Sequence, residues 1–232
     1  WRLEPKPEDI EKYKRGEAVE PVKPIVFYID PSTPKQWREE IKAGVRDWQA
    51  AFEAAGFKNA VVAKDAPEGD EDFDIDDIRY SVITYAASQQ ANAMGPSVVD
   101  PRSGEIIEAD VVWWHNVMSL LHTWMRVQTA PIDPRARANK LSDEHMASAI
   151  RFVSSHEVGH TFGLKHNMGA SHAFPVDSLR SPSFTAKMGG TASSIMDYAR
   201  FNYVAQPGDG VKEITPKSGR MTSSRLTGLI VG

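Results

Sequence analysis

Three histidines and a glutamate lie within one short stretch, residues 156–166, at spacings that could bind a metal ion. His156 and His160 are four residues apart, so on a helix both imidazoles lie on one face and point at one position. Glu157 follows His156, and on that helix it can hydrogen-bond a water molecule beside the ion without binding the ion itself. The spacing therefore predicts a metal site with an acid–base carboxylate next to it.

His166 can reach the same metal only if the chain leaves the helix and turns beneath the site. Gly163 permits this turn, because a positive φ costs glycine little and costs a residue with a Cβ much more. The chain contains no cysteine, so metal ligands must come from His, Asp, Glu or backbone oxygen. Three neutral imidazoles with one open coordination position suit a catalytic zinc, whereas structural zinc is closed by four protein ligands. We therefore expect His156, His160 and His166 to bind Zn²⁺.

A single pair of histidines on a helix is more often an ordinary surface or core pair than a metal site. Here the complete set of three His, one Glu and one Gly makes chance a poor explanation. The other histidines lack metal-ligand spacing and are expected to be surface or hydrogen-bonded residues. They are His115, His122, His145 and His172, of which His172 is close enough in sequence to line the cleft.

The composition of the whole chain limits the classes of function. With 232 residues and 41% hydrophobic content, the chain can form one sizeable core, which favours a single domain. The net charge of -4 comes from interspersed acidic and basic residues, so nucleic acid is not an expected partner. No apolar run approaches the roughly 18 residues of a membrane span. The chain starts at Trp1 without a signal peptide, and we expect it to be part of a larger protein.

The first fifty residues predict a surface segment, a strand and a helix. Residues 1–23 are charged and proline-containing, which favours an extended linker or surface strap. Residues 24–29 are nearly all apolar or β-branched, as in a buried strand. A helix should begin at Thr33, and its apolar residues recur every three or four positions until Gly56 ends it. This long helix must pack on a sheet.

The remaining strands of that sheet precede the histidine motif. Residues 59–64 and 78–85 are typical of strands, and residues 91–99 and 105–113 are typical of a hairpin. The acidic segment 68–77 briefly imitates a calcium loop. It lacks the glycine and the final glutamate of that pattern, so a solvated loop is the favoured interpretation.

The histidine motif itself is expected on a helix that Ser142 caps. Before it, residues 115–128 have helical spacing and residues 129–140 contain prolines typical of a loop. After it, residues 169–193 are rich in Ser, Pro and Gly and show no periodicity. Long loops of that kind in a compact domain are usually functional or disordered.

Two stretches of the sequence resemble the metzincin clan of zinc peptidases. Residues 156–166, His-Glu-Val-Gly-His-Thr-Phe-Gly-Leu-Lys-His, are similar to the clan's zinc-binding signature. Residues 194–198, Ser-Ile-Met-Asp-Tyr, look like its Met-turn. The resemblance implies that Met196 forms an apolar floor beneath the imidazoles, where plain core filling is the alternative. It also implies that Tyr198 lies near the metal and either ligates zinc or stabilises an oxyanion.

A further similarity, carried by residues 24–30 and 196–203, is to an uncharacterised group of exported bacterial zinc-dependent metallopeptidases. It implies a periplasmic, cell-surface or extracellular location. Asn167 differs from the residue that follows the third histidine in astacins, serralysins, matrixins and adamalysins. The specificities of those families are therefore not carried over.

The resemblance also implies an architecture. We expect an α+β, metzincin-like zincin fold, with a twisted mixed sheet, a long backing helix and the active-site helix in an N-terminal lobe, residues 24–166. Residues 167–232 would form a small irregular C-terminal lobe, since no clear helix follows Gly210. A protein or peptide substrate would add as a strand to the sheet edge near Ala91 to Pro96, although Pro96 would end its pairing.

The implied function is that of a zinc-dependent endopeptidase. Water activated by the metal would attack the peptide bond, with Glu157 as general base and then general acid. The alternative is a catalytically inactive, zinc-bearing binding or scaffold module. The intact Glu157, Gly163 and Met196 argue against that alternative, because loss of the base is the simplest mark of a dead site. Hydrolysis of a non-peptide amide by the same chemistry is a third interpretation.

Overall fold

The apolar, β-branched segments of the first half of the chain form a five-stranded sheet. The structure is a computed structural model that describes residues 1–216. The strands are β1 Ile25–Ile29, β2 Val61–Asp65, β3 Ser81–Ala86, β4 Ala93–Met94 and β7 Val111–Trp114. Their order is β2-β1-β3-β7-β4, which leaves β4 at one edge. All neighbours are parallel except β4, which runs antiparallel to β7. The sheet is therefore mixed, as expected.

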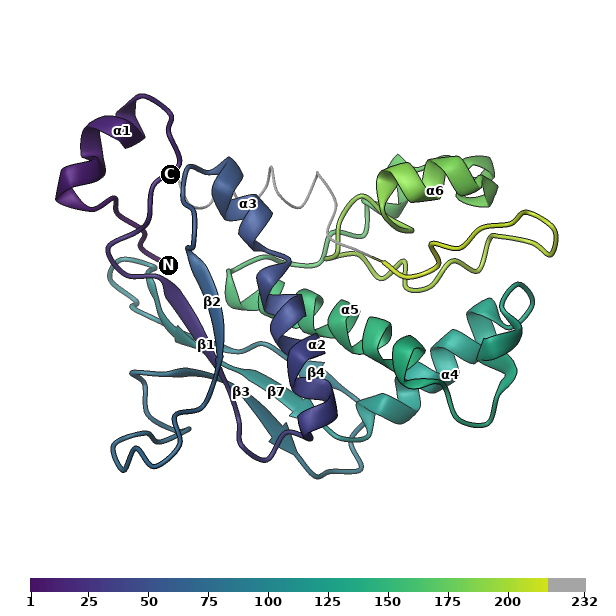
Figure 1. The fold of residues 1–232 in the computed structure, drawn as a ribbon, viewed down its shortest axis with the longest axis horizontal. Coiled ribbons are helices and arrows are strands. Elements are labelled where there is room, and N and C mark those ends of the chain that lie inside the picture. Colours follow the sequence, from purple (N-terminus) through teal and green to yellow (C-terminus); the bar gives the residue numbers. More distant parts are fainter. Residues whose placement is uncertain (217–232) are drawn as a thin grey trace.

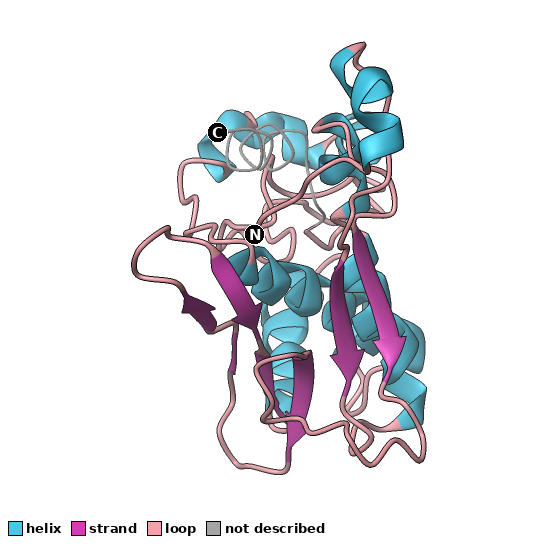
Figure 2. Cartoon of the chain, turned by 90° about the vertical axis from the view of Figure 1, so that its left-hand side faces the viewer, coloured by secondary structure: helices cyan, strands magenta, loops and turns pink. Residues whose placement is uncertain are grey.

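Helices pack against one face of this sheet (Figures 1 and 2). α2 Lys35–Arg46 and α5 Asp143–Thr161 lie side by side, and α4 Val117–Thr129 follows β7 and contacts α5. The largest side chains that are fully buried come from both layers, and they include Phe27, Ile41, Trp48, Ile83, Trp113 and Ile150. The fold is α+β, with the helix that carries the histidines packed against the sheet.

The prediction of a single long helix after Thr33 is wrong, because the structure contains two helices there. α2 ends at Arg46, and α3 Gln49–Ala54 follows after a short break. At the break, the backbone N–H of Trp48 bonds to Val45 O, three residues back. The indole of Trp48 is fully buried, and its Nε1 donates to Ser155 O of α5 at 2.8 Å. This contact with a distant helix fixes the break, and the apolar pattern continues through it.

The predicted hairpin is confirmed. β5 Ser97–Val99 and β6 Ile106–Ala109 form a separate antiparallel pair between β4 and β7 in the sequence. The turn contains Gly104 at φ +77, in the left-handed region that favours glycine. Asp110 N donates to Pro96 O at 3.1 Å, which ties the hairpin to the end of β4.

The N-terminal segment is more ordered than an extended linker. It contains η1 Pro7–Asp9 and α1 Ile10–Lys14, and Val19 is buried in the core. Val19 exchanges backbone hydrogen bonds with the turn after α3, accepting from Lys58 N at 2.9 Å. The segment therefore packs on the domain as a strap that includes a short helix.

The long loop expected over residues 169–193 also contains helical segments. The most regular is α6 Pro182–Met188, where Ser181 caps the N-terminus, proline occupies the first position and Gly189 ends the helix at φ +72. These are ordinary helix signals that the Ser- and Gly-rich composition conceals. The shorter 3-10 segments are η3 Ser171–Ala173 and η4 Val176–Arg180, and η2 Pro134–Arg137 lies in the loop before α5.

Within residues 1–216, no helix is long and apolar enough to cross a membrane. The expected C-terminal lobe is described as far as residue 216. The stretch after Gly210, for which the sequence predicts no clear helix, lies mostly outside the described residues.

Candidate active site

Helix α5 is fixed against its neighbours immediately before the histidine motif. Ser154 Oγ donates to Ile41 O of α2 at 2.8 Å, and Ser155 O accepts the indole N–H of Trp48 at 2.8 Å. Both serines are buried. These bonds hold α5 in one rotational position relative to α2, so the direction in which His156 leaves the helix is fixed.

The three predicted metal ligands converge on one point. One ring nitrogen from each of His156, His160 and His166 lies within 4.8 Å of the others. Helix α5 ends at Thr161, and Gly163 then adopts φ +82, which turns the chain back beneath the helix. As a result His166 Nε2 lies 3.1 Å from His160 Nε2. The local sequence therefore brings the third imidazole to the first two.

Hydrogen bonds to backbone carbonyls set the protonation of the first two imidazoles. His156 Nδ1 lies 2.8 Å from Ile195 O, and His160 Nδ1 lies 2.8 Å from Leu164 O. A carbonyl can only accept, so each Nδ1 carries the proton and each Nε2 has a free lone pair. Burial lowers the pKa of His156 to about 4, and it also lowers the pKa of His166. Neutral imidazoles with free Nε2 atoms are the donors that zinc requires, so the residues fit this metal.

Glu157 lies on the same helix and faces the same region. Its side chain is buried, and it lines a small cavity together with His156 and Tyr198. Burial raises the pKa of the Glu157 carboxyl to about 7. Among the described residues, this carboxyl has no hydrogen-bond or ion-pair partner, which leaves its oxygens available to a ligand.

The Met-turn residues support the site from below. Met196 is buried, and its sulfur contacts the position where a Cβ would extend from Gly159 of α5. Ile195 O accepts from His156, and Met196 O accepts from Asn167 N at 2.8 Å. Backbone carbonyls of the Met-turn therefore hold both His156 and Asn167, the residue after His166.

Tyr198 lies beside the imidazoles. Its ring centroid is 4.3 Å from that of His166 and 5.6 Å from that of His156. Burial is the main cause that raises the pKa of its hydroxyl, with a further contribution from Glu157. Sequence reasoning missed two neighbours of this tyrosine, Trp124 and Arg200, which share the cavity with it. Trp124 lies on α4, which no motif connects to the histidines, and Arg200 follows Tyr198 by two residues but has no role predicted from the sequence.

The edge strand β4 lies against the active-site helix. A Cβ added at Gly95, the residue after β4, would lie 2.5 Å from Glu157 O and 3.2 Å from His160 Cβ. Only glycine allows the chain to pass this close to α5. The segment from Ala91 to Pro96, expected at the sheet edge, therefore runs directly past the catalytic candidates.

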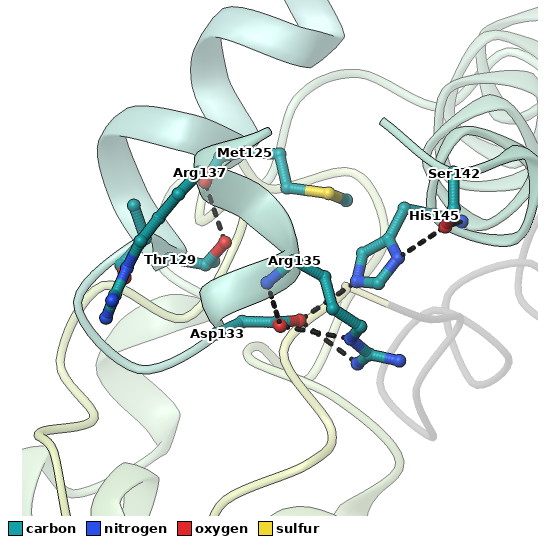
Figure 3. Close-up of polar contacts among 8 residues, drawn as sticks. Met125, Thr129, Asp133, Arg135, Arg137, Ser142 and His145 are labelled. Atoms are coloured by element: carbon teal, nitrogen blue, oxygen red, sulfur yellow. Dashed lines mark hydrogen bonds and ion pairs between the residues drawn. The ribbon is translucent and has the colours of Figure 1, made fainter. Parts of the chain in front are cut away.

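The remaining histidines have other partners. Figure 3 shows His145 between two residues, with Nε2 at 2.9 Å from Asp133 Oδ2 and Nδ1 at 2.9 Å from Ser142 Oγ. Ser142 also caps α5, since its Oγ accepts from His145 N. His115 Nδ1 contacts Tyr85 OH, and His122 Nε2 contacts the carbonyl of residue 138. His172 lines a separate cavity that also includes Tyr198.

Comparison with known proteins finds a family model that matches the part of the chain that contains this site. Residues 138–221 match the model of a family described as Met-zincin. The matched segment contains the three histidines, Glu157 and the Met-turn, and the histidine cluster fits a metzincin zinc site. The resemblance to the metzincin clan is therefore confirmed. No curated protein and no solved structure matches the chain.

Proposed function

We propose, from the Met-zincin match and the three converging imidazoles, that this chain is the catalytic domain of a zinc-dependent endopeptidase with a metzincin-like zincin fold. His156, His160 and His166 would hold the zinc through their ring nitrogens. When bound, zinc supplies a Lewis acid that polarises a peptide carbonyl and lowers the pKa of water to about 7. The observation that carries the proposal is the convergence of three imidazoles beside a carboxylate that has no partner within residues 1–216.

Glu157 is the proposed general base and acid. Its carboxylate oxygen takes a proton from the attacking water, and it later delivers this proton to the nitrogen of the leaving amine. The burial of Glu157 and its lack of other partners among the described residues support this role. Tyr198 is the proposed donor to the developing oxyanion, because its ring lies against His156 and His166 while half of its surface is open to a ligand.

The substrate is proposed to bind as an added strand at the edge strand β4. In the part of the chain that the structure describes, β4 pairs with β7 and has no strand on its other side, and the backbone passes directly over α5 at Gly95. An extended peptide paired with this edge would cross the histidine cluster. Pro96 lacks an N–H and limits such pairing to the residues before it. We further propose, from the sequence resemblance, that the protein is exported and that this domain is part of a larger protein.

The test of the proposed function is the Glu157→Gln variant. The amide keeps the shape of the side chain but cannot accept the proton, so we expect zinc to be retained and kcat for peptide hydrolysis to fall by about 10²- to 10⁴-fold. Zinc is measured by elemental analysis, and hydrolysis with a fluorogenic peptide library.

Glu144→Gln is the matched control, since Glu144 is an exposed residue in the first turn of the same helix. It should keep wild-type turnover. Undiminished hydrolysis by Glu157→Gln would reject the general-base role. A wild-type protein that binds zinc and cuts no peptide would instead favour an inactive binding or scaffold module.

A further inference from the structure

A small cavity beside the histidine cluster combines apolar walls with one cationic side chain. Its volume is about 150 Å³, and it lies between α4, α5, the start of β4 and the segment after Met196. His156 and Glu157 line it, so a ligand group held there lies next to the proposed catalytic residues. The lining also includes Leu120, Val153, Trp124 and Arg200.

The guanidinium of Arg200 has no anionic partner among the residues that the structure describes. It stacks on Trp124, with Cζ 3.9 Å from the ring centroid, and lies 5.7 Å from the centroid of Tyr198. Within residues 1–216, no carboxylate lies within 4.0 Å of its nitrogens, and its N–H groups donate no hydrogen bond. By contrast, Arg180 in the same part of the chain is held by Asp209 at 2.8 Å. A half-buried cation whose donors are unused can bind an anionic group of a ligand.

The backbone of Arg200 is held in an unusual conformation. Its φ is +54, in the left-handed region that residues with a Cβ rarely adopt. Thr191 Oγ1 donates to Arg200 O at 2.8 Å, and Phe201 N donates to Gln128 Oε1 of α4 at 3.1 Å. Such strain persists only where the surroundings enforce it, and it is concentrated at ligand sites. The side chain of Arg200 lies over the ring of Trp124 and lines the cavity.

We propose that Arg200 is a specificity residue that binds a carboxylate of the substrate next to the scissile bond. This inference rests on the proposed peptidase function. The planar guanidinium presents N–H donors that match a carboxylate, and the stack on Trp124 holds this plane in place before the ligand arrives. The carboxylate belongs either to an Asp or Glu side chain that flanks the scissile bond, as in an endopeptidase, or to the C-terminus of the chain being cut, in which case the peptidase removes C-terminal residues instead. In both cases the enzyme selects a negative charge at one defined position.

A purely structural role for Arg200 makes a different prediction. If the guanidinium only packs on Trp124 to anchor the segment after the Met-turn, its replacement changes stability and overall rate. It leaves the preference between charged and neutral substrates unchanged. The ratio of kcat/KM for two matched peptides therefore separates the two roles, because a general loss of activity cancels in the ratio.

The experiment uses zinc-loaded protein and amidated fluorogenic peptides in which each residue flanking the scissile bond is in turn Glu, Gln or Lys. At one of the two positions we expect the wild type to prefer Glu over Gln by about tenfold in kcat/KM. Arg200→Gln should bring this ratio to about one, and Arg200→Glu should shift the preference to Lys. Arg126→Gln, an exposed arginine on α4, is the matched control and should keep the wild-type ratio.

A second pair of peptides distinguishes the two sources of the carboxylate. They end one residue after the scissile bond and carry either a free C-terminal carboxylate or an amide. If the wild type prefers the free acid and Arg200→Gln loses this preference, Arg200 binds the C-terminal carboxylate of the substrate. If the preference is confined to peptides with an internal Glu, Arg200 binds the side-chain carboxylate. Equal rates for Glu and Gln, and for acid and amide, in the wild type would overturn the proposal.

Failure of the peptidase function is measured separately. If the wild type cuts no peptide, binding of the same labelled peptides to the zinc-loaded Glu157→Gln protein is measured by fluorescence anisotropy. Tighter binding of the Glu peptide, lost in the Glu157→Gln, Arg200→Gln double variant, supports the carboxylate site without turnover. Equal affinities for Glu and Gln peptides contradict it. Arg200→Lys keeps the charge without the planar fork, and it should retain part of the preference if the variants fold.

Discussion

Gly159, between the first two histidines, is a residue whose function depends on distant parts of the chain. In a helix interior glycine normally costs about 1 kcal/mol relative to alanine. Here a Cβ would lie 2.6 Å from Trp48 Cζ2 and would also meet the sulfur of Met196. The absence of a side chain lets the tryptophan and the Met-turn approach the helix between His156 and His160.

Gly159→Ala should therefore destabilise the protein, although the same change in an open helix stabilises it. We expect a loss of about 1 to 3 kcal/mol in the free energy of unfolding, because the added methyl overpacks the core. Displacement of Met196 should also weaken zinc binding. Chemical denaturation of the zinc-free protein and a competitive zinc titration measure the two effects.

The reverse change Ala147→Gly is the control on the same helix, where Ala147 is half-buried and propensity dominates. Ala147→Gly should lower the free energy of unfolding by about 0.5 to 1 kcal/mol. A Gly159→Ala protein more stable than the wild type would show that the helix has room for the methyl group.

Individual residues of the site differ in how far the sequence predicts them. The histidines, Glu157 and Gly163 are predictable because their geometry is local, set by one helix and one turn. Trp124 is not, because tertiary packing brings it to the site from a separate helix, and the segments that contain Gly95 and Arg200 are predicted near the site without roles for these two residues. Their roles depend on which strand and helix face α5, and no spacing along the chain encodes this.

At the scale of elements, a group of three residues, Asp133, Arg135 and His145, joins the start of α5 to the loop before it (Figure 3). We call this group the clamp. Asp133 accepts from Arg135 at 3.0 Å and contacts His145 Nε2 at 2.9 Å, so one carboxylate joins η2 to the helix that carries His156 and His160. Burial alone would raise the pKa of Asp133, but the hydrogen bonds from Arg135 and His145 outweigh it and lower this pKa to about 2. The clamp is thus built around an ionised carboxylate.

This clamp predicts a dependence of stability on pH. The pKa of Asp133 is lower in the folded state than its unfolded value of about 3.9. The contribution of the Asp133 carboxylate to the free energy of unfolding is therefore fully present above about pH 4, and it is lost as the pH falls towards 2. The contribution is on the order of 1 to 2 kcal/mol. Asp133→Asn should lose this amount at pH 6 and differ little from the wild type near pH 2.

The measurement is urea denaturation at several pH values. Asp143→Asn is the control, since Asp143 is an exposed residue in the first turn of α5 and interacts mainly with the helix dipole. Asp143→Asn should lower the free energy of unfolding at pH 6 by less than Asp133→Asn does. An equal loss for Asp133→Asn at pH 6 and pH 2 would show that the carboxylate is not the source of the stability.

Most elements were predictable to within a few residues, and the exceptions have physical causes. β1 follows from its continuous run of apolar and β-branched residues, and the hairpin β5–β6 follows from its β-like segments and the turn residues between them. The break between α2 and α3 does not, because the indole of Trp48 reaches a carbonyl of α5 far along the chain. α6 carries ordinary cap signals at Ser181 and Gly189, but the surrounding composition is that of a loop.

At the scale of the whole molecule, the site is assembled from parts that are distant in sequence. The N-terminal strap reaches the end of the active-site helix, where Trp1 Nε1 donates to Thr161 O at 2.8 Å. The sheet edge, helix α5 and the Met-turn meet at the histidine cluster. The α+β class follows from the pattern of strands and helices, whereas the lining of the cleft depends on how these parts pack.

The most direct test of the central claim is peptide hydrolysis measured against zinc content in one preparation of the full chain. We expect the purified protein to bind about one zinc ion per chain through its three histidines. Removal of zinc with a chelator should abolish hydrolysis, and restoring about one equivalent should recover it, while Glu157→Gln stays inactive at the same zinc content. Hydrolysis that continues unchanged in the zinc-free protein would contradict the account.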